Sequence, residues 1–277
     1  MTVVGSPRPQ TRLLVNSTPA GVGTRPSLDG AGPQARRVSV PGTRDTFEQA
    51  SVAKKGPSKT EAPTPPLPSE GTDPFEGLRD AALLRAIKES SSGKHVKSYT
   101  EARKLIFGEL DVVNGKVTCV YTGREIQGGK PPKSTDMNVE HTWPQSKGAT
   151  GAAKSDLHHL FPTDSKANSK RGNWPFGEVV NVKWSENGAK FGTDAQGRTV
   201  FEPPDSHKGN VARAMFYFSS TYSKAIPDSE EAVLREWNDL DAVDTAEIAR
   251  NQRVAELQGN VNQFVEHEDL VDRIKDF

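Results

Sequence analysis

The chain has 277 residues, and its 36 Lys and Arg residues balance its 36 Asp and Glu residues at neutral pH. This length permits one or two domains, and the single cysteine, Cys119, excludes an internal disulfide. No apolar run approaches the length of a membrane-spanning helix, so we expect no membrane partner.

The N-terminal segment differs in composition from the rest of the chain. Residues 1–70 hold eleven of the twenty prolines, and Phe47 is their one aromatic residue. Such a segment cannot bury enough apolar surface to offset the entropy lost on ordering. We therefore predict a disordered, Pro-rich tail over residues 1–70 and one folded domain over residues 71–277. The first residues lack the basic and apolar regions of a secretory signal.

Hydrophobic periodicity and breaker residues predict a mainly helical α+β domain with a few short strands. Helices are expected from Gly77 to Lys88, from Ser98 or Thr100 to Leu110, from Asn210 to Ser223, from Asp228 or Ser229 to Leu240, and from Thr245 onward. Strands are expected at residues 117–121, 137–143, 179–184 and 197–202. In the last helix, Ile248, Val254 and Leu257 are expected to form the buried side.

The stretch 138–178 contains three of the six histidines and the highest density of groups that bind metals, move protons or hold phosphates. A neutral imidazole such as His141 can accept a proton from water near pH 7. The carboxylate of Glu140 beside it can bind a hard divalent ion such as Mg²⁺. Neighbouring side chains on a regular strand point to opposite faces. Both can serve one site only where the strand ends or bulges, and Pro144 supports an ending.

A second group of polar residues follows in the same stretch. The mixed polar and apolar run before Pro162 is expected to stop there. Thr163 or Asp164 is expected to cap a short helix that carries Asn168 and ends near Arg171. An Asn offers a neutral carbonyl oxygen, which partners a carboxylate around Mg²⁺, and an Arg offers a planar fork suited to a phosphate.

Three ordered motifs carry a resemblance to a known family. They read Glu-His-x-x-Pro at residues 140–144, Ser-Asp-Leu-His-His-Leu-x-Pro-Thr-Asp at 155–164, and Asn-x-x-Arg-Gly-Asn-x-Pro-Phe-Gly at 168–177. Together they resemble the endonuclease I family, which consists of bacterial periplasmic and extracellular nucleases of the ββα-metal, or His-Me finger, type. The resemblance covers roughly residues 75–277 and implies that fold.

The resemblance also implies roles for individual residues. His141 would be the general base that activates water, and Glu140 with Asn168 would hold one divalent ion, Mg²⁺, with Mn²⁺ or Ca²⁺ as substitutes. The ion would stabilise charge on the scissile phosphate and the leaving 3′ oxygen, and the products would carry 5′-phosphates. Arg171 is a second candidate catalytic residue, by contacting a phosphate or by bracing the loop. Lys154 stands where some relatives have a glutamate that assists the leaving group.

Plainer interpretations stay open for the neighbouring residues. His158 and His159 could ligate zinc, but no second Cys or His cluster occurs at finger spacing. A buried, hydrogen-bonded histidine that braces the catalytic loop is favoured instead. Trp143, Trp174 and Phe176 could stack on bases, but packing of the loops is favoured.

We therefore predict a Mg²⁺-dependent, sequence-nonspecific endonuclease acting on DNA, with RNA left open as a second substrate. Residues 130–171 carry seven Lys or Arg against four acids, and this local excess favours contact with a phosphate backbone. The alternatives are a catalytically inactive nucleic-acid-binding module of the same fold, and an interaction protein that works through its N-terminal tail. We expect a monomeric protein that is secreted or periplasmic.

Overall fold

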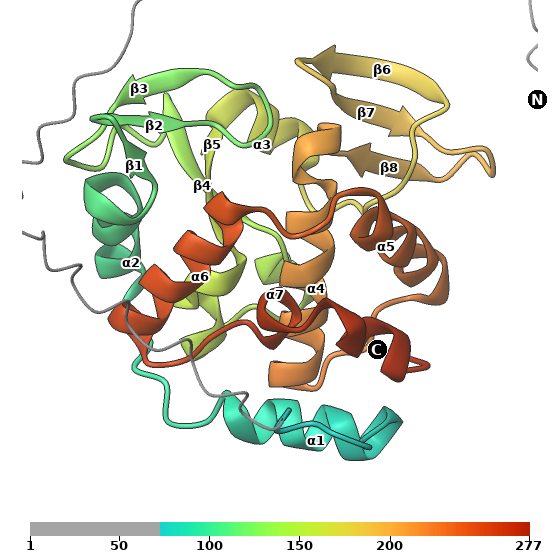
Figure 1. The fold of residues 1–277 in the computed structure, drawn as a ribbon. Coiled ribbons are helices and arrows are strands. Elements are labelled where there is room, and N and C mark those ends of the chain that lie inside the picture. The colour runs from blue at the N-terminus through green and yellow to red at the C-terminus, as the bar shows by residue number, and fades with distance from the viewer. Residues whose placement is uncertain (1–72) are drawn as a thin grey trace, which may run out of the picture. The chain divides into compact units, whose positions relative to one another are not determined.

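The computed structural model describes residues 73–277, so the predictions for residues 1–70 lie outside the described residues. Residues 73–277 combine helices with three small antiparallel sheets, which confirms the predicted α+β class (Figure 1). No helix in this part of the chain has the length and apolarity needed to cross a membrane.

The helices and strands occur in mixed order along the chain. The α-helices are α1 (Asp80–Ser90), α2 (Tyr99–Leu105), α3 (Ser165–Arg171), α4 (Lys208–Tyr222), α5 (Asp228–Leu240), α6 (Thr245–Gln258) and α7 (Gln263–Glu266). The first sheet contains β1 (Val112–Val113), β2 (Lys116–Thr118) and β3 (Glu125–Gln127), and the second contains β4 (Met137–His141) and β5 (Leu160–Asp164). The third contains β6 (Asn181–Glu186), β7 (Ala189–Thr193) and β8 (Thr199–Glu202).

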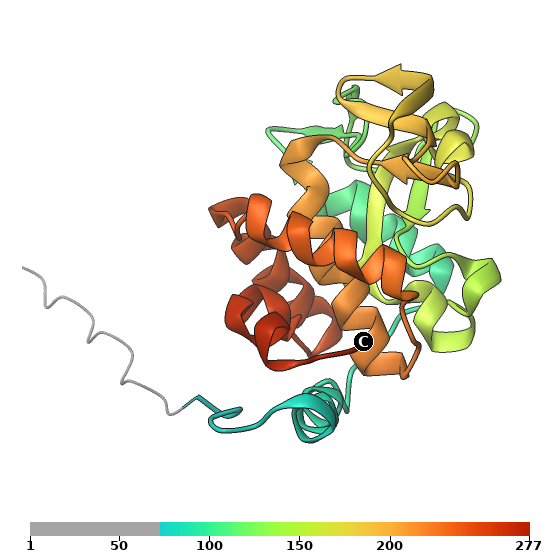
Figure 2. The same ribbon diagram turned by 90° about the vertical axis from the view of Figure 1, so that its right-hand side faces the viewer.

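Helix α4 is the central element of the core. Thirteen of its fifteen residues are buried, and helices α1, α5 and α7 all pack against it. Figure 1 and Figure 2 both show α4 running through the helical part of the molecule. Trp143 stacks on Phe218 of α4, with ring centroids 4.8 Å apart. The loop that follows β4 is therefore anchored directly to the core.

The β4–β5 pair and helix α3 form the unit that positions the central stretch. The two strands are antiparallel, with Glu140 opposite Phe161. Strand β5 leads straight into α3, where the Asp164 carboxylate accepts the backbone N–H groups of Lys166 at 2.9 Å and Ala167 at 3.3 Å. This is the N-cap predicted from the sequence. Because α3 packs on both strands, the cap fixes it against β4 from its first turn.

Strand β5 corrects one expectation. Pro162 does not stop the preceding run but lies inside the strand, opposite Val139. The β4–β5 sheet has only two strands, so a residue without an N–H group can occupy a position where no full ladder is required. The carbonyl of Pro162 still accepts the N–H of Val120 at 3.1 Å. The sequence pattern also does not predict β3 or β7, whose short, polar segments lack a clear alternation.

Helix α6 corrects another expectation. Ile248 is 39% exposed, so its placement on the buried side is wrong. The buried side instead includes the polar residues Glu247 and Asn251. Glu247 accepts the Arg213 Nη2 hydrogen bond from α4 at 2.6 Å. Val254 is buried as expected, and a buried ion pair across the helix interface adds to the apolar contacts of this helix.

Candidate active site

A cleft of about 410 Å³ opens beside the end of β4 and collects most of the predicted site residues. The lining comes from separate segments: Tyr99 of α2, Ser134, residues 138–141 of β4, residues 144–146, Asn168 of α3, and residues 172 and 173. The structure thus brings Glu140, His141 and Asn168 to one cleft, and Arg171 is not part of its lining.

Glu140 and His141 share this cleft because the strand ends at His141. Strand β4 stops there, and the chain turns at Pro144 into a single 3-10 turn. The N–H of Thr142 donates to the carbonyl of His159 at 3.0 Å, which fixes the exit from the strand. The expected strand ending is therefore confirmed, and it allows adjacent side chains to serve one site.

The imidazole of His141 is held as a neutral base. Its Nε2 lies 3.0 Å from the carbonyl oxygen of Lys154, and because a carbonyl only accepts, Nε2 carries the proton. Nδ1 is then left unprotonated, with the Gln145 amide nitrogen at 3.4 Å. Burial, and after it the nearby His159, lower the pKa of His141 to about 3. The ring is thus an acceptor at neutral pH.

The Glu140 carboxylate is buried and its charge is only partly compensated. Its Oε1 accepts the Tyr121 hydroxyl at 3.3 Å and lies 3.1 Å from Nε of Arg171. Burial raises the pKa of Glu140 to about 7, and the Arg171 charge and the Tyr121 hydrogen bond oppose this rise. A further cation would favour the charged carboxylate.

The side chain of Asn168 is oriented by the hydrogen bonds of its amide nitrogen. Its amide nitrogen donates to Oδ1 of Asn138 at 2.6 Å and to the carbonyl of Val139 at 3.3 Å. Within residues 73–277, neither Oδ1 of Asn168 nor Oε2 of Glu140 accepts a hydrogen bond. A carboxylate and an amide oxygen with no internal partner form a donor set that suits a hard divalent cation with several waters.

No group of three or more His, Cys, Asp or Glu side chains suited to a metal occurs in the described part of the chain. A cation in the cleft would therefore depend on the amide oxygen of Asn168 and on water as well as on Glu140. This ligand set is typical of Mg²⁺ and not of structural zinc, which takes four Cys or His ligands.

Arg171 is completely buried. It donates through Nη2 to the carbonyl of Thr142 at 3.1 Å and through Nη1 to the carbonyl of Trp174. Its guanidinium lies over the Phe176 ring, 3.9 Å from the centroid. Of the two interpretations that the sequence leaves open, these contacts favour bracing of the loop and of Glu140 over contact with a phosphate.

The two adjacent histidines hydrogen-bond to different parts of the backbone. Nε2 of His158 lies 2.9 Å from the carbonyl of Asn260, and Nε2 of His159 lies 2.7 Å from the carbonyl of Ala153. The ring of His159 also packs edge-on against His141, with centroids 5.7 Å apart. His159 thus contacts both the Ala153 backbone and the ring of His141, as expected of a buried, hydrogen-bonded histidine that braces this loop.

The aromatic residues of the central stretch differ in their exposure. Trp143 and Phe176 are 5% and 1% exposed, so they pack the loops as expected. Trp174 is 42% exposed, and packing alone therefore does not describe it. Its ring lies 6.3 Å from that of Phe191 on β7.

Asp156 joins the loop before β5 to the helical core through several buried hydrogen bonds. It is completely buried and accepts the hydroxyls of Tyr217 at 2.8 Å and Tyr222 at 2.6 Å, and the amide of Gln258 at 2.8 Å. Burial raises the pKa of Asp156, but His158 and these hydrogen bonds hold it below the ordinary value. Asp156 therefore ties the loop before β5 to helices α4 and α6.

The sequence does not predict four further residues that line the cleft or hydrogen-bond to Glu140: Tyr99, Tyr121, Asn138 and Gln145. Asn138 precedes Glu140 by two positions, and such residues share a strand face, so the strand pattern contains a usable signal. The two tyrosines come from distant segments, and nothing in their spacing indicates the cleft.

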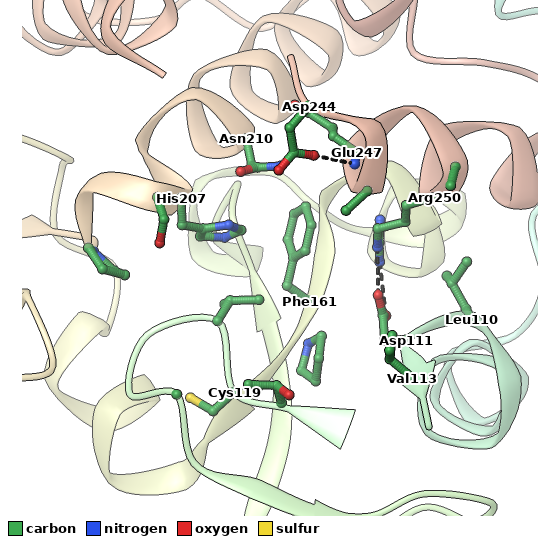
Figure 3. A pocket seen from close by; sticks show the side chains of 18 of the residues that line it. Leu110, Asp111, Val113, Cys119, Phe161, His207, Asn210, Asp244, Glu247 and Arg250 are labelled. Carbon is green, nitrogen blue, oxygen red and sulfur yellow. Dashed lines mark hydrogen bonds and ion pairs between the residues drawn. The ribbon is translucent and has the colours of Figure 1, made fainter. Parts of the chain in front are cut away.

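A second cavity, of about 640 Å³, shares no lining residue with the cleft. Figure 3 shows His207 and Phe161 among its walls, with Arg250 paired to Asp111. Burial lowers the pKa of His207 to about 3. This cavity contains none of the residues predicted for catalysis or metal binding.

The neutral imidazole, the buried carboxylate and the amide oxygen thus line one open cleft. Comparison with known proteins gives the family: the Endonuclease I profile matches residues 84–269. The chain belongs to the endonuclease I family, as the motifs predict, and is therefore a nucleic-acid hydrolase.

The similar proteins include enzymes named for either nucleic acid. The chain is 32% identical over 241 residues to the extracellular ribonuclease of Bacillus subtilis (strain 168), covering 76% of this chain and 81% of that protein. The extracellular ribonuclease of Bacillus amyloliquefaciens is 32% identical over 261 residues, 86% of each chain. An extracellular deoxyribonuclease of Aeromonas hydrophila is 29% identical over 113 residues, 41% of this chain and 50% of that protein.

Proposed function

We propose that this chain is a divalent-metal-dependent, sequence-nonspecific endonuclease that hydrolyses DNA and RNA and leaves 5′-phosphate ends. The observation that carries the proposal is the convergence of Glu140, His141 and Asn168 on one cleft, each with an acceptor atom free of a strong internal hydrogen bond. Relatives named as ribonucleases and as a deoxyribonuclease support both substrates. The catalytic domain extends over residues 71–277.

The β4–β5 pair and α3 act together as the ββα-metal unit in this proposal. Glu140 on β4 and Asn168 on α3 would hold the divalent ion, and Mg²⁺ fits a site with two oxygen ligands and water. When bound, the ion supplies positive charge to the scissile phosphate and to the leaving 3′ oxygen. Arg171 acts as a positioning residue, because its fork holds Oε1 of Glu140 and the carbonyl of Thr142.

His141 acts as the general base. Nδ1 accepts a proton from a water molecule, and the resulting hydroxide attacks phosphorus while the bond to the 3′ oxygen breaks and that oxygen takes up a proton from solvent water. The Lys154 carbonyl holds the proton on Nε2 throughout. It therefore fixes the productive tautomer and stabilises the imidazolium that forms. The Gln145 amide, 3.4 Å from Nδ1, is placed to orient that water.

The setting of this activity is also part of the proposal. Two of the relatives are named as extracellular ribonucleases, and we infer that this chain likewise works outside the cytoplasm. We expect it to act as a monomer, with a single peak of monomer mass in light scattering.

A calorimetric titration with MnCl₂ and MgCl₂ tests the metal site without relying on activity. Glu140→Gln and Asn168→Ala should each weaken binding by about tenfold or more, because each removes an oxygen ligand or its charge. His141→Ala should bind the ions like the wild type, since its ring is not a ligand here. Unchanged affinity in both ligand variants would contradict the proposed site.

A further inference from the structure

Lys154 contacts the candidate site through both its backbone and its side chain. Its carbonyl oxygen lies 3.0 Å from Nε2 of His141. Its ammonium lies 5.1 Å from the centroid of the Tyr99 ring. The Tyr99 ring lines the cleft and lies 5.4 Å from the His141 ring, with the planes 32° apart. The distance from the ammonium to the centre of the His141 ring is therefore at most the sum of these two distances.

The charge of Lys154 is not neutralised by the protein. Within residues 73–277, no Asp or Glu oxygen lies at ion-pair distance from its ammonium, whereas Arg171 is paired with Glu140. The side chain is half-buried, and the face of an aromatic ring holds a cation in place without cancelling its charge. A ring that lines the cleft, that of Tyr99, thus holds a positive charge that has no carboxylate partner among the described residues.

We propose that Lys154, held by the ring of Tyr99, binds a backbone phosphate next to the scissile one. This inference rests on the proposed nuclease function and adds a substrate-positioning residue to it. An ammonium is a point charge that binds phosphate without a fixed fork geometry. An ammonium that has no carboxylate partner among the described residues adds to the local attraction for a polyanion.

A phosphate beside the reacting one is bound equally in the ground state and in the transition state. Lys154→Ala should therefore raise KM about tenfold and leave kcat within about twofold. The slope of log affinity against log salt should become shallower by roughly 0.7 to 0.9, the contribution of one phosphate contact. Lys154→Arg should restore KM and the salt slope, because it keeps the charge.

Lys88 offers a matched control for the loss of one positive charge. It lies on α1, where its ammonium hydrogen-bonds to Ser223 Oγ at 2.8 Å and has no carboxylate partner among the described residues. Helix α1 lies at the opposite end of the folded part from α3 (Figure 1). Lys88→Ala should change neither KM nor the salt slope, so a general charge effect is separated from a local contact.

The role of Tyr99 is tested by coupling. Tyr99→Ala should raise KM, because the ammonium loses the ring that positions it, and Lys154→Ala in that background should have less than its usual effect. In a Tyr99→Phe background, which keeps the ring face, Lys154→Ala should retain its full effect on KM. Fully additive effects of the two alanine substitutions would overturn the positioning role of the ring.

The deciding experiment measures binding of a fluorescein-labelled single-stranded oligonucleotide by anisotropy, in EDTA, over a KCl series. The full-length wild type, Lys154→Ala, Lys154→Arg and Lys88→Ala are compared, and gels confirm an intact probe. A shallower slope for Lys154→Ala alone supports the contact. An unchanged slope, or a fall in kcat with KM unchanged, would overturn it. Failure of the wild type to cut in Mg²⁺ would instead refute the proposed function, since the salt slope does not depend on cutting.

Discussion

At the scale of single residues, Glu140 and Arg171 form a buried pair in which each depends on the other. Nε of Arg171 lies 3.1 Å from Oε1 of Glu140, and both side chains are almost completely buried. Removal of one partner leaves an uncompensated buried charge, which is far more costly than loss of a surface ion pair. The same pair therefore affects both the free energy of unfolding and the charge of the carboxylate that lines the cleft.

Arg171→Ala should lower the free energy of unfolding by about 3 kcal/mol, because it strands the Glu140 carboxylate and two backbone carbonyls. Urea unfolding followed by fluorescence measures the change. Asn173→Ala is the control, because Asn173 is exposed and donates only to Ser146 Oγ, at 3.2 Å. A folded Arg171→Ala protein of normal stability that had lost only affinity for nucleic acid would identify Arg171 as a phosphate ligand.

The residues of the site differ in how far the sequence predicts them. Glu140, His141 and Asn168 could be named because their chemistry is concentrated in one stretch with ordered spacing. Tyr99 and Tyr121 could not, because their contacts with His141 and Glu140 arise only from tertiary packing. The sequence also cannot show that burial moves the pKa of Glu140 upward.

At the scale of elements, helix α3 depends on its N-cap. Asp164 accepts two backbone N–H groups of the first turn and also pairs with Nε of Arg124 at 2.7 Å. The helix has seven residues, too few to be stable without its cap and tertiary contacts. The cap therefore contributes to holding Asn168 over the cleft.

Asp164→Ala should cost about 1 kcal/mol of stability through loss of the cap and should weaken metal binding through displacement of Asn168. Asp164→Asn keeps a capping oxygen while removing the charge paired with Arg124, so it should retain most of both properties. Thermal unfolding and the MnCl₂ titration measure the two effects. Equal losses in both variants would show that the ion pair, and not the cap, supports α3.

The helices and strands, like the site residues, differ in how far the sequence predicts them. Helix α2 was predictable, because Ser98 and Glu101 form the capping box that their spacing indicates. Helix α4 was predictable from its apolar residues. Strand β5 was not, because Pro162 is a strand breaker by type, and only its pairing with β4 makes it part of a sheet.

At the scale of the whole molecule, several buried neutral histidines make stability depend on pH, and His158 and His207 are two of them. Burial lowers the pKa of His158 to about 4 and that of His207 to about 3, against about 6.5 in an unfolded chain. Below pH 6.5 the unfolded state therefore binds more protons than the folded state. The free energy of unfolding should fall as pH falls, by at most about 1.4 kcal/mol per pH unit for each histidine.

Urea unfolding between pH 7 and pH 5 measures this slope. His207→Gln should flatten it, because one of the histidines with a lowered pKa is removed, and the change should grow as pH falls. His95→Gln is the matched control, since His95 is exposed. A slope that stays the same after His207→Gln would show that His207 does not remain neutral in the folded protein.

Truncation tests how the chain is divided. The family match at residues 84–269 lies inside the proposed domain of residues 71–277. A protein that starts at residue 71 should therefore cut with kcat/KM within about twofold of the full chain. A folded but inactive core would show that the N-terminal segment takes part in catalysis.

The central claim is that His141 and a divalent ion in this cleft cut nucleic acid. The most direct measurement is nicking of supercoiled plasmid at low salt by the wild type and by His141→Ala, with Mg²⁺ and with EDTA. We predict nicking by the wild type that requires Mg²⁺, and a loss of several orders of magnitude in His141→Ala with DNA affinity retained. Cutting by folded His141→Ala at the wild-type rate would contradict the account. Absence of cutting by the folded wild type with Mg²⁺, Mn²⁺ or Ca²⁺ would favour a binding module that does not cut.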